Sequence, residues 1–219
     1  MGDDIGVFEA MHTCRAIRYL KPDPVPDELI RKILDAAIRA PSGSNRQSWH
    51  FLVIKDAATR KMIQERYKRA FDAYAAMTAS APPRPGVSSE TMDRVRKSAT
   101  HLAEHLHEAP ILLMPLLVNE QGTLRGDGPL QTLARKSTYS SIYPAVQNIL
   151  LACRALGPGA CLTTLHLMYE EEIAKVLGLP PNVESMCLIP VGWPAAKLGG
   201  VTRVPVEEVS SLDRYGRRW

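Results

Sequence analysis

Apolar residues recur at helical spacing in several parts of the chain. Between residues 27 and 39 the apolar positions follow an i, i+3, i+4 pattern, Asp27 can cap the first turn, and Pro41 and Gly43 end the periodicity. This pattern predicts an amphipathic helix with one face turned toward a core. The same reasoning predicts helices over residues 27–39, 57–79, 90–108, 139–156 and 170–177.

Short apolar runs between these segments predict strands. They cover residues 49–54, 111–118, 160–165 and 186–191, and the run 111–118 is apolar enough to be buried on both faces. Two stretches predict irregular structure, because 80–89 is rich in proline and 119–128 is polar and glycine-rich. Long helices separate the strands and no hairpin signal is present, so we expect an α+β or α/β fold with helices packed on a central sheet.

Composition indicates one globular domain. The 219 residues suffice for one well-packed core, and 45% hydrophobic and 23% charged residues are ordinary values. The net charge of +4 comes without a basic stripe interleaved with aromatic residues, so nucleic acid is not expected as a partner. We therefore expect residues 1–219 to form a single domain.

Cysteine usage and hydropathy predict a cytoplasmic protein. The four cysteines form no CxxC pair, which is typical of free thiols in a reducing compartment. The first residues have no apolar segment typical of a signal peptide, and the run 111–118 is too short to span a bilayer. No membrane partner is expected.

Candidate chemistry gathers near the amino-terminal end. Arg15 and Arg18 precede a proline-punctuated loop, and arginine binds phosphate through paired, charge-assisted hydrogen bonds. By themselves, two arginines are more often a solvated pair. A polar loop follows the predicted helix 27–39, in which Ser42 and Asn45 offer donors and acceptors and Gly43 permits close approach of the backbone.

These two segments resemble motifs of the nitroreductase family of flavin enzymes. The first resembles the family signature Arg-Arg-Ser-x-Arg, which holds the flavin phosphate and ribityl chain, and reads Cys14-Arg15-Ala16-Ile17-Arg18. Cys14 replaces the first arginine and Ala16 replaces the serine. The resemblance therefore implies that Arg15, Arg18 and a more distant cation bind the phosphate.

The polar loop is the more specific motif. It resembles the family's Pro-Ser-Ser-x-Asn-x-Gln-Pro-Trp-x-Phe, with Ser48 in place of the usual second proline, and begins Pro41-Ser42-Gly43-Ser44-Asn45. In the family this loop meets the flavin ring edge and the ribityl hydroxyls. On its own, the segment would also suit an ordinary turn between a helix and a strand.

Two further motifs follow in the family's order. The segment 157–164 resembles the one that passes over a face of the flavin, which implies contacts near N5 and O4 from Leu162, Thr163 and Thr164. The Gly-Trp-Pro at 192–194 is followed by Arg203, which the resemblance makes the distant phosphate cation. Residues from about 66 to 135 carry no signature and correspond to the variable region that shapes the substrate pocket.

The resemblance implies an α+β fold with a mixed central sheet flanked by helices, in an intertwined homodimer. Each of two FMN sites would take Arg15, Arg18 and Arg203 from one subunit and the 42–45 loop from the other. The tail 201–219 is polar and extended in character, and it would wrap the partner. NADPH or NADH would deliver hydride to flavin N5, and an electron-poor small molecule such as a nitroaromatic or a quinone would then be reduced. No catalytic side chain is required.

Other functions remain open at this point. Relatives of this architecture dehalogenate iodotyrosine or fragment reduced flavin, and Thr163-Thr164 slightly resembles the deiodinase branch. A non-catalytic FMN-binding protein is a further alternative. His101, His105 and His107 lack a completing set of ligands, so no metal is expected. The absence of GxGxxG and GxxxxGK[ST] motifs argues against a Rossmann or P-loop site.

Overall fold

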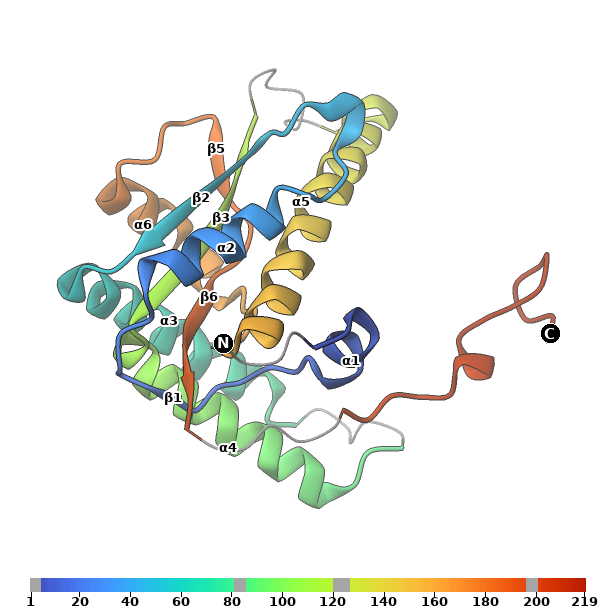
Figure 1. The fold of residues 1–219 in the computed structure, drawn as a ribbon, viewed down its shortest axis with the longest axis horizontal. Coiled ribbons are helices and arrows are strands. Elements are labelled where there is room, and N and C mark those ends of the chain that lie inside the picture. The colour runs from blue at the N-terminus through green and yellow to red at the C-terminus, as the bar shows by residue number, and fades with distance from the viewer. Residues whose placement is uncertain (1–4, 81–85, 120–126, 196–200) are drawn as a thin grey trace.

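An antiparallel sheet flanked by helices organises the computed structural model, which describes residues 5–80, 86–119, 127–195 and 201–219 (Figure 1). The strand order is β1-β6-β3-β2, with β4 paired to β6 and β5 paired to β3. The strands are β1 (Leu20–Lys21), β2 (Trp49–Ile54), β3 (Ile111–Val118), β4 (Gly159–Ala160), β5 (Val183–Ser185) and β6 (Ile189–Pro194). The predicted α+β class is confirmed.

The strand pairs found among the described residues are all antiparallel, whereas the resemblance implied a mixed sheet. The connection between β2 and β3 gives a physical reason. It contains two long helices, so the chain reverses three times and enters β3 against the direction of β2. A single crossover helix would have produced a parallel pair. Trp49 pairs with Leu117 and Ile54 with Leu112.

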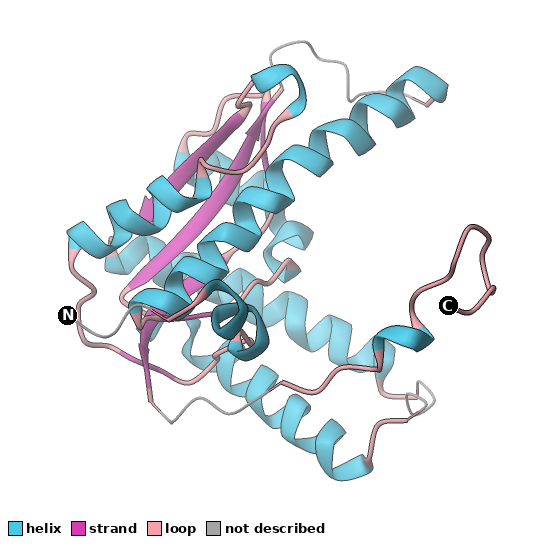
Figure 2. Ribbon diagram, turned by 45° about the vertical axis from the view of Figure 1, so that its right-hand side comes forward, coloured by secondary structure: helices cyan, strands magenta, loops and turns pink. Residues whose placement is uncertain are grey.

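Strand β3 is buried on both faces and divides the core into two layers. Ile111 and Leu113 pack with helices α2 (Asp27–Ala37) and α5 (Pro129–Leu156) on one face. Leu112 and Met114 alternate with them and pack on the other face with helices α3 (Ala57–Thr78), α4 (Ser89–His105) and α6 (Glu170–Leu177). Figure 2 shows helices in front of the sheet and behind it. The predicted central sheet between layers of helices is therefore confirmed.

Most helices begin and end near the predicted residues. The α-helices are α1 (Val7–Thr13), α2 (Asp27–Ala37), α3 (Ala57–Thr78), α4 (Ser89–His105), α5 (Pro129–Leu156) and α6 (Glu170–Leu177). Helix α4 ends earlier than expected, because the chain tightens into a 3-10 turn over Leu106–Glu108. Helix α1 and strand β1 were not predicted, since both are too short to show a hydrophobic period.

Helix α5 begins ten residues before the predicted start at residue 139. Pro129 occupies its first turn, where a missing N–H does no harm. The added residues 129–138 are mostly polar or exposed, and Leu133 is 62% exposed. Ala134 is the described hydrophobic residue of this part that packs against a core cluster, beside Leu117 and Met186, so the sequence carries no continuous apolar stripe.

Two predicted strands have different limits. The strand expected over 160–165 is confined to β4, and beyond it only Thr163 pairs, in an isolated bridge with Leu188. The strand expected over 186–191 overlaps only β6, which begins at Ile189 and continues to Pro194. Strand β5 precedes the expected range and was not predicted, and both strands pair with β3. The predicted irregular stretches 80–89 and 119–128 lie partly outside the described residues, which omit 81–85 and 120–126.

The carboxyl-terminal tail extends away from the body of the molecule (Figure 1). It contains one 3-10 turn, Val206–Glu208, and its apolar side chains Val204, Val209 and Trp219 are exposed. A tail with this exposure has little apolar burial to order it within a single chain. No helix of the described residues has the length and apolar character that a bilayer span requires.

A buried histidine links the segment after β4 to β5. His166 has no exposed surface, and its Nε2 lies 2.7 Å from the Ser185 hydroxyl oxygen. The Ser185 N–H donates to the Glu170 carboxylate at 2.9 Å. Within the described structure, Nδ1 of His166 has no hydrogen-bond partner. Burial lowers the pKa of His166 to about 4, because a charged imidazolium would be poorly solvated there.

This burial makes stability depend on pH. The folded-state pKa lies below the ordinary value of 6.5, so the stabilisation is complete above pH 6.5 and is lost as the pH falls toward 4. At pH 5 the loss amounts to about 2 kcal/mol. Urea unfolding at pH 7 and pH 5 measures it, and His166→Gln should show a smaller pH dependence than the wild type. Equal pH dependence in the two proteins would contradict the assignment.

Candidate functional site

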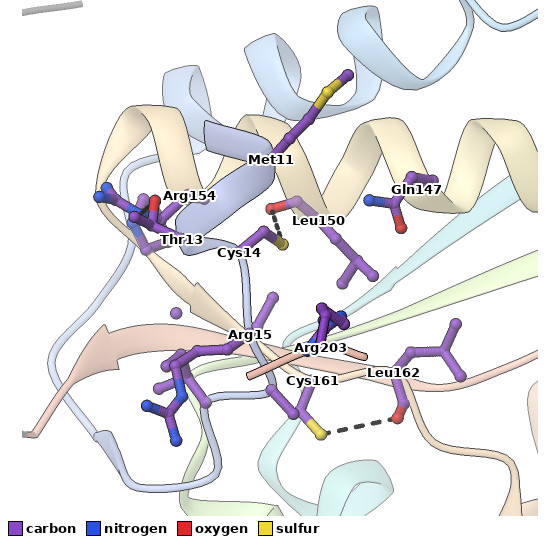
Figure 3. Close-up of a pocket in the computed structure, with 15 residues that line it drawn as sticks. Met11, Thr13, Cys14, Arg15, Gln147, Leu150, Arg154, Cys161, Leu162 and Arg203 are labelled. Atoms are coloured by element: carbon purple, nitrogen blue, oxygen red, sulfur yellow. Dashed lines mark hydrogen bonds between the residues drawn. The ribbon is translucent and has the colours of Figure 1, made fainter. Parts of the chain in front are cut away.

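A cavity of about 250 Å³ lies between the amino-terminal segment and the end of α5 (Figure 3). The segment 158–162 forms one wall and Arg203 of the tail closes another. The lining residues are Met11, Thr13, Cys14, Arg15, Ala16, Ile17, Gln147, Leu150, Arg154, Pro158, Gly159, Ala160, Cys161, Leu162 and Arg203. We call this the arginine cavity.

Backbone contacts fix the walls of the arginine cavity. Helix α1 ends where Cys14 adopts an extended conformation, and the Ile17 N–H donates to the Ala160 carbonyl at 2.9 Å. Gly159 permits this approach, because a Cβ there would lie 2.7 Å from Cγ2 of Ile17. The segment that carries Arg15 is therefore held against β4.

The arginine cavity is strongly basic. Arg15, Arg154 and Arg203 line it, and none of its described lining residues carries a carboxylate. Burial raises the pKa of the Cys14 thiol, while Arg154 and Arg203 oppose that rise. Three guanidinium groups around one cavity favour an anion, and the planar donors of arginine suit phosphate in particular.

Arg18 is not among the residues that line the arginine cavity. Its Nη1 donates to the Ser98 hydroxyl on α4 at 3.3 Å, and its charge opposes the burial-driven rise in the pKa of Cys161. Arg15 lines the arginine cavity, whereas Arg18 reaches Ser98 on α4. Within one chain, the two side chains thus do not converge as the signature suggested.

The polar loop forms a second hollow, which we call the loop cavity, with a volume of about 540 Å³. Ser141 of α5 accepts a hydrogen bond from the Gly43 N–H at 3.1 Å, and the Ser42 hydroxyl accepts from the Gln47 N–H at 3.1 Å. Its lining residues are Ser42, Gly43, Ser44, Arg46, Gln47, Ser48, Trp49, Leu117, Val118, Asn119, Ser137, Thr138, Ser141 and Ile142.

The backbone of this loop is strained. Ser44, Asn45 and Gln47 have φ values of 53°, 53° and 51°, in the left-handed region that residues other than glycine rarely adopt. Such conformations are unfavourable by on the order of 1–3 kcal/mol each and concentrate at ligand sites. The loop therefore keeps a shape that its own sequence does not favour locally.

Helix α5 connects the two cavities. Gln147, Leu150 and Arg154 border the arginine cavity, while Ser141 and Ile142 border the loop cavity. At 1.5 Å per residue, Ser141 and Leu150 are roughly 14 Å apart along the helix. Within one chain the arginine cavity and the loop cavity are thus separate hollows.

The segment after β4 divides its side chains between different neighbours. Leu162 lines the arginine cavity, and Thr164 is exposed. Thr163 is bound on the opposite side: its backbone pairs with Leu188, and its hydroxyl lies 2.8 Å from that of Tyr67 on α3. Burial raises the pKa of Tyr67, so its hydroxyl stays protonated and joins α3 to this segment.

The structure thus sorts the predicted site residues into three groups. The first group lines the arginine cavity and contains Cys14, Arg15, Ala16, Ile17, Leu162 and Arg203. The second group lines the loop cavity and contains Ser42, Gly43 and Ser44. Five predicted residues are not among the described lining residues of either cavity: Arg18, Pro41, Asn45, Thr163 and Thr164.

Sequence reasoning missed Arg154 and Ser141. Ser141 lies in a predicted helix, but nothing local indicates that it contacts the 41–45 loop. Arg154 lies in the last turn of α5, where a cation is common because it complements the helix dipole. Neither position carries a local signal of ligand binding. In the described part of the chain, no cluster of three or more His, Cys, Asp or Glu side chains suits a metal ion.

The close packing of Gly159 can be tested directly. We expect Gly159→Ala to lower the free energy of unfolding by about 1–3 kcal/mol, because its Cβ meets Ile17 and Leu20 at 2.7–3.0 Å. Gly6→Ala is the matched control, since nothing lies within 4 Å of a Cβ at that position. Urea unfolding compares Gly159→Ala with Gly6→Ala. The coupling free energy between positions 159 and 17 comes from Gly159→Ala, Ile17→Ala and the double variant. Equal stability of the two alanine variants, or additive effects with Ile17→Ala, would refute the contact.

Comparisons with known proteins agree with this geometry. A model of the Nitroreductase family matches residues 13–193. A protein described as NADH dehydrogenase from Thermus thermophilus is 31% identical over 196 residues, which cover 89% of this chain and 90% of that protein.

Solved structures show the same fold. A BluB-like flavoprotein from Clostridium difficile 630 superposes with a TM-score of 0.72 at 26% identity, covering 96% of this chain and 100% of that one. An iodotyrosine deiodinase bound to FMN and 3-iodo-L-tyrosine superposes with a TM-score of 0.70 at 22% identity, covering 96% of this chain and 99% of that one. The family match covers most of the chain, including every described lining residue of the two cavities except Met11 and Arg203, so this protein belongs to the nitroreductase family.

Proposed function

We propose that this protein is an FMN-dependent oxidoreductase that uses NADPH or NADH to reduce electron-poor acceptors such as nitroaromatics or quinones. The observation that carries the proposal is the arginine cavity, with three guanidinium groups and no carboxylate among its described lining residues. When bound, FMN would accept a hydride at one ring atom and donate it from the same atom.

The donor set fits a flavin mononucleotide. Arg15, Arg154 and Arg203 can neutralise one terminal phosphate, and Ser42 and Ser44 of the loop cavity offer groups for ribityl hydroxyls and the ring edge. Pockets for small ligands typically measure about 300–1,000 Å³, so the arginine cavity of about 250 Å³ suits only part of the cofactor. The remaining part requires a second surface.

A homodimer would provide that surface. Helix α5 presents an exposed stripe that includes Leu133, Ser140, Tyr143 and Gln147 at helical spacing, and the stripe runs past the loop cavity as far as the arginine cavity. A two-fold axis near the middle of this stripe would set two copies of α5 antiparallel, so that the arginine cavity of one protomer faces the loop cavity of its partner. The exposed apolar residues of the tail 201–219 would then be covered by the partner.

The chain's own residues would bind and orient rather than transfer protons. Burial raises the pKa values of Cys14 and Cys161, so both thiols are protonated at neutral pH. Leu162 presents an apolar side chain toward the arginine cavity, and the Tyr67–Thr163 hydrogen bond holds its segment against α3. We propose that the region 66–135, with α3 and α4, shapes the substrate side.

A second candidate reaction keeps FMN and changes the acceptor. The fold is shared with a BluB-like flavoprotein and with a deiodinase bound to FMN and 3-iodo-L-tyrosine. Reductive dehalogenation or flavin fragmentation is therefore the alternative, and non-catalytic FMN binding is the remaining one. We further propose one domain over residues 1–219 and a cytoplasmic location, which the four free cysteines support.

We expect the purified protein to be yellow and to release FMN rather than FAD on denaturation, because the arginine cavity accommodates one phosphate group. Under anaerobic conditions NADH or NADPH should bleach the visible absorbance, and a nitroaromatic or a quinone should restore it. Recovery with 3-iodotyrosine and iodide release would favour dehalogenation instead. If neither nucleotide bleaches the absorbance, the protein binds FMN but does not carry out the proposed reaction. A colourless protein that does not take up FMN would exclude the flavin site.

A mixed dimer tests whether the site is shared. Arg203→Glu reverses a charge of the arginine cavity, and Gly43→Phe fills the loop cavity at a position where a Cβ meets only Ser141 at 3.9 Å. Each variant homodimer should lose most of its FMN. A heterodimer purified through two different tags should recover one intact site. Both substitutions then fall in the same one of its two composite sites, and the other site contains neither. FMN content and light scattering measure the result, and a heterodimer as empty as its parents would place the site within one chain.

A further inference from the structure

Arg154 occupies a position that the family signature does not assign to the phosphate. It lies in the last turn of α5, far in sequence from Cys14, yet both side chains line the arginine cavity (Figure 3). We propose that Arg154 supplies the phosphate-binding cation that position 14 lacks, so that this chain has moved one cation from the amino-terminal segment to α5. This inference rests on the proposed function.

The environment of Arg154 holds its charge at the cavity wall. The side chain is only 21% exposed, and its Nε donates to the Thr13 hydroxyl at 2.8 Å. Its Nη2 lies 4.0 Å from a carboxylate oxygen of Glu9, which is a weak ion pair at that distance. A guanidinium carries five N–H donors, so the bond to Thr13 leaves donors available for an anion.

The electrostatics at Cys14 give the second argument. Arg154 and Arg203 both lower the pKa of the Cys14 thiol against the larger effect of burial, so both cations act on the same point. Figure 3 shows Cys14 between these two arginines. A third guanidinium at position 14 would stand in a field that is already positive and would be repelled. A small neutral thiol avoids that repulsion and leaves the volume to the ligand.

The simplest competing role is structural. Through Thr13 and Glu9, Arg154 could serve only to hold α1 against α5, and a cation also suits the end of a helix. A tether of this kind would act on every ligand of the cavity alike. A phosphate ligand would distinguish FMN from riboflavin, which has the same ring and ribityl chain but no phosphate.

The experiment titrates apoprotein of the full chain with FMN and with riboflavin, following flavin fluorescence. Arg154→Gln should raise the dissociation constant for FMN about ten- to a hundredfold, as expected for one charge-assisted contact. The constant for riboflavin should change little. Arg154→Lys should keep part of the preference for FMN. Arg39→Gln is the matched control, because Arg39 pairs with Asp35 on the exposed side of α2.

Two further variants separate the cation from the tether. Glu9→Gln removes the acidic partner of Arg154 without touching the cavity lining, so FMN should bind as tightly as before or more tightly. If Arg154 served only to hold α1 against α5, Glu9→Gln would weaken FMN binding as Arg154→Gln does. Cys14→Arg should not tighten FMN binding in the wild-type background, but it should restore much of the affinity lost in Arg154→Gln, because the two positions supply one charge.

The outcomes distinguish this inference from the proposed function. Wild-type apoprotein that binds neither flavin would refute the flavin site, and the role of Arg154 with it. Wild-type protein that prefers FMN, with Arg154→Gln weakening FMN and riboflavin equally or leaving both unchanged, would refute only the role of Arg154. That role would also be refuted if Cys14→Arg tightened FMN binding equally in both backgrounds.

Discussion

The contact between the amino-terminal segment and β4 is the constraint on which the site depends. The Ile17 N–H donates to the Ala160 carbonyl, and Gly159 leaves room for the Ile17 side chain. This contact joins residues separated by more than half the chain, and it holds Arg15 beside the end of α5. Without it, the arginines of the first segment and of α5 would have no reason to share one cavity.

The accumulation of positive charge in that cavity follows from the same contact. Arg15, Arg154 and Arg203 bring positive charge to one cavity that has no carboxylate among its described lining residues, and like charges near one another are unfavourable. The proposed phosphate ligand would offset that cost. The left-handed backbone at Ser44 and Asn45 is a second unfavourable arrangement, in the loop cavity.

The sequence predicted local elements well and convergent contacts poorly. Strands β2 and β3 and helix α6 have the predicted limits, because each has a clear apolar pattern or cap signals of its own. The family motifs singled out Arg15 and Arg203, which line one cavity, but they gave no reason for Arg18 to bond Ser98 on α4. That contact depends on where α4 packs, which a motif does not encode. Arg154 was missed for the same reason.

The largest error in the helix assignments falls beside the loop cavity. The first ten residues of α5 show no continuous apolar stripe because little of this part packs against the core, and Ser137 and Thr138 in it line the loop cavity. Their polar character conflicts with a core helix but suits the wall of a ligand site. Local rules fail most often where function has replaced packing as the constraint on sequence. Helix α5 borders both cavities, and the contribution of its polar first part to the loop cavity could be recognised only once the fold was known.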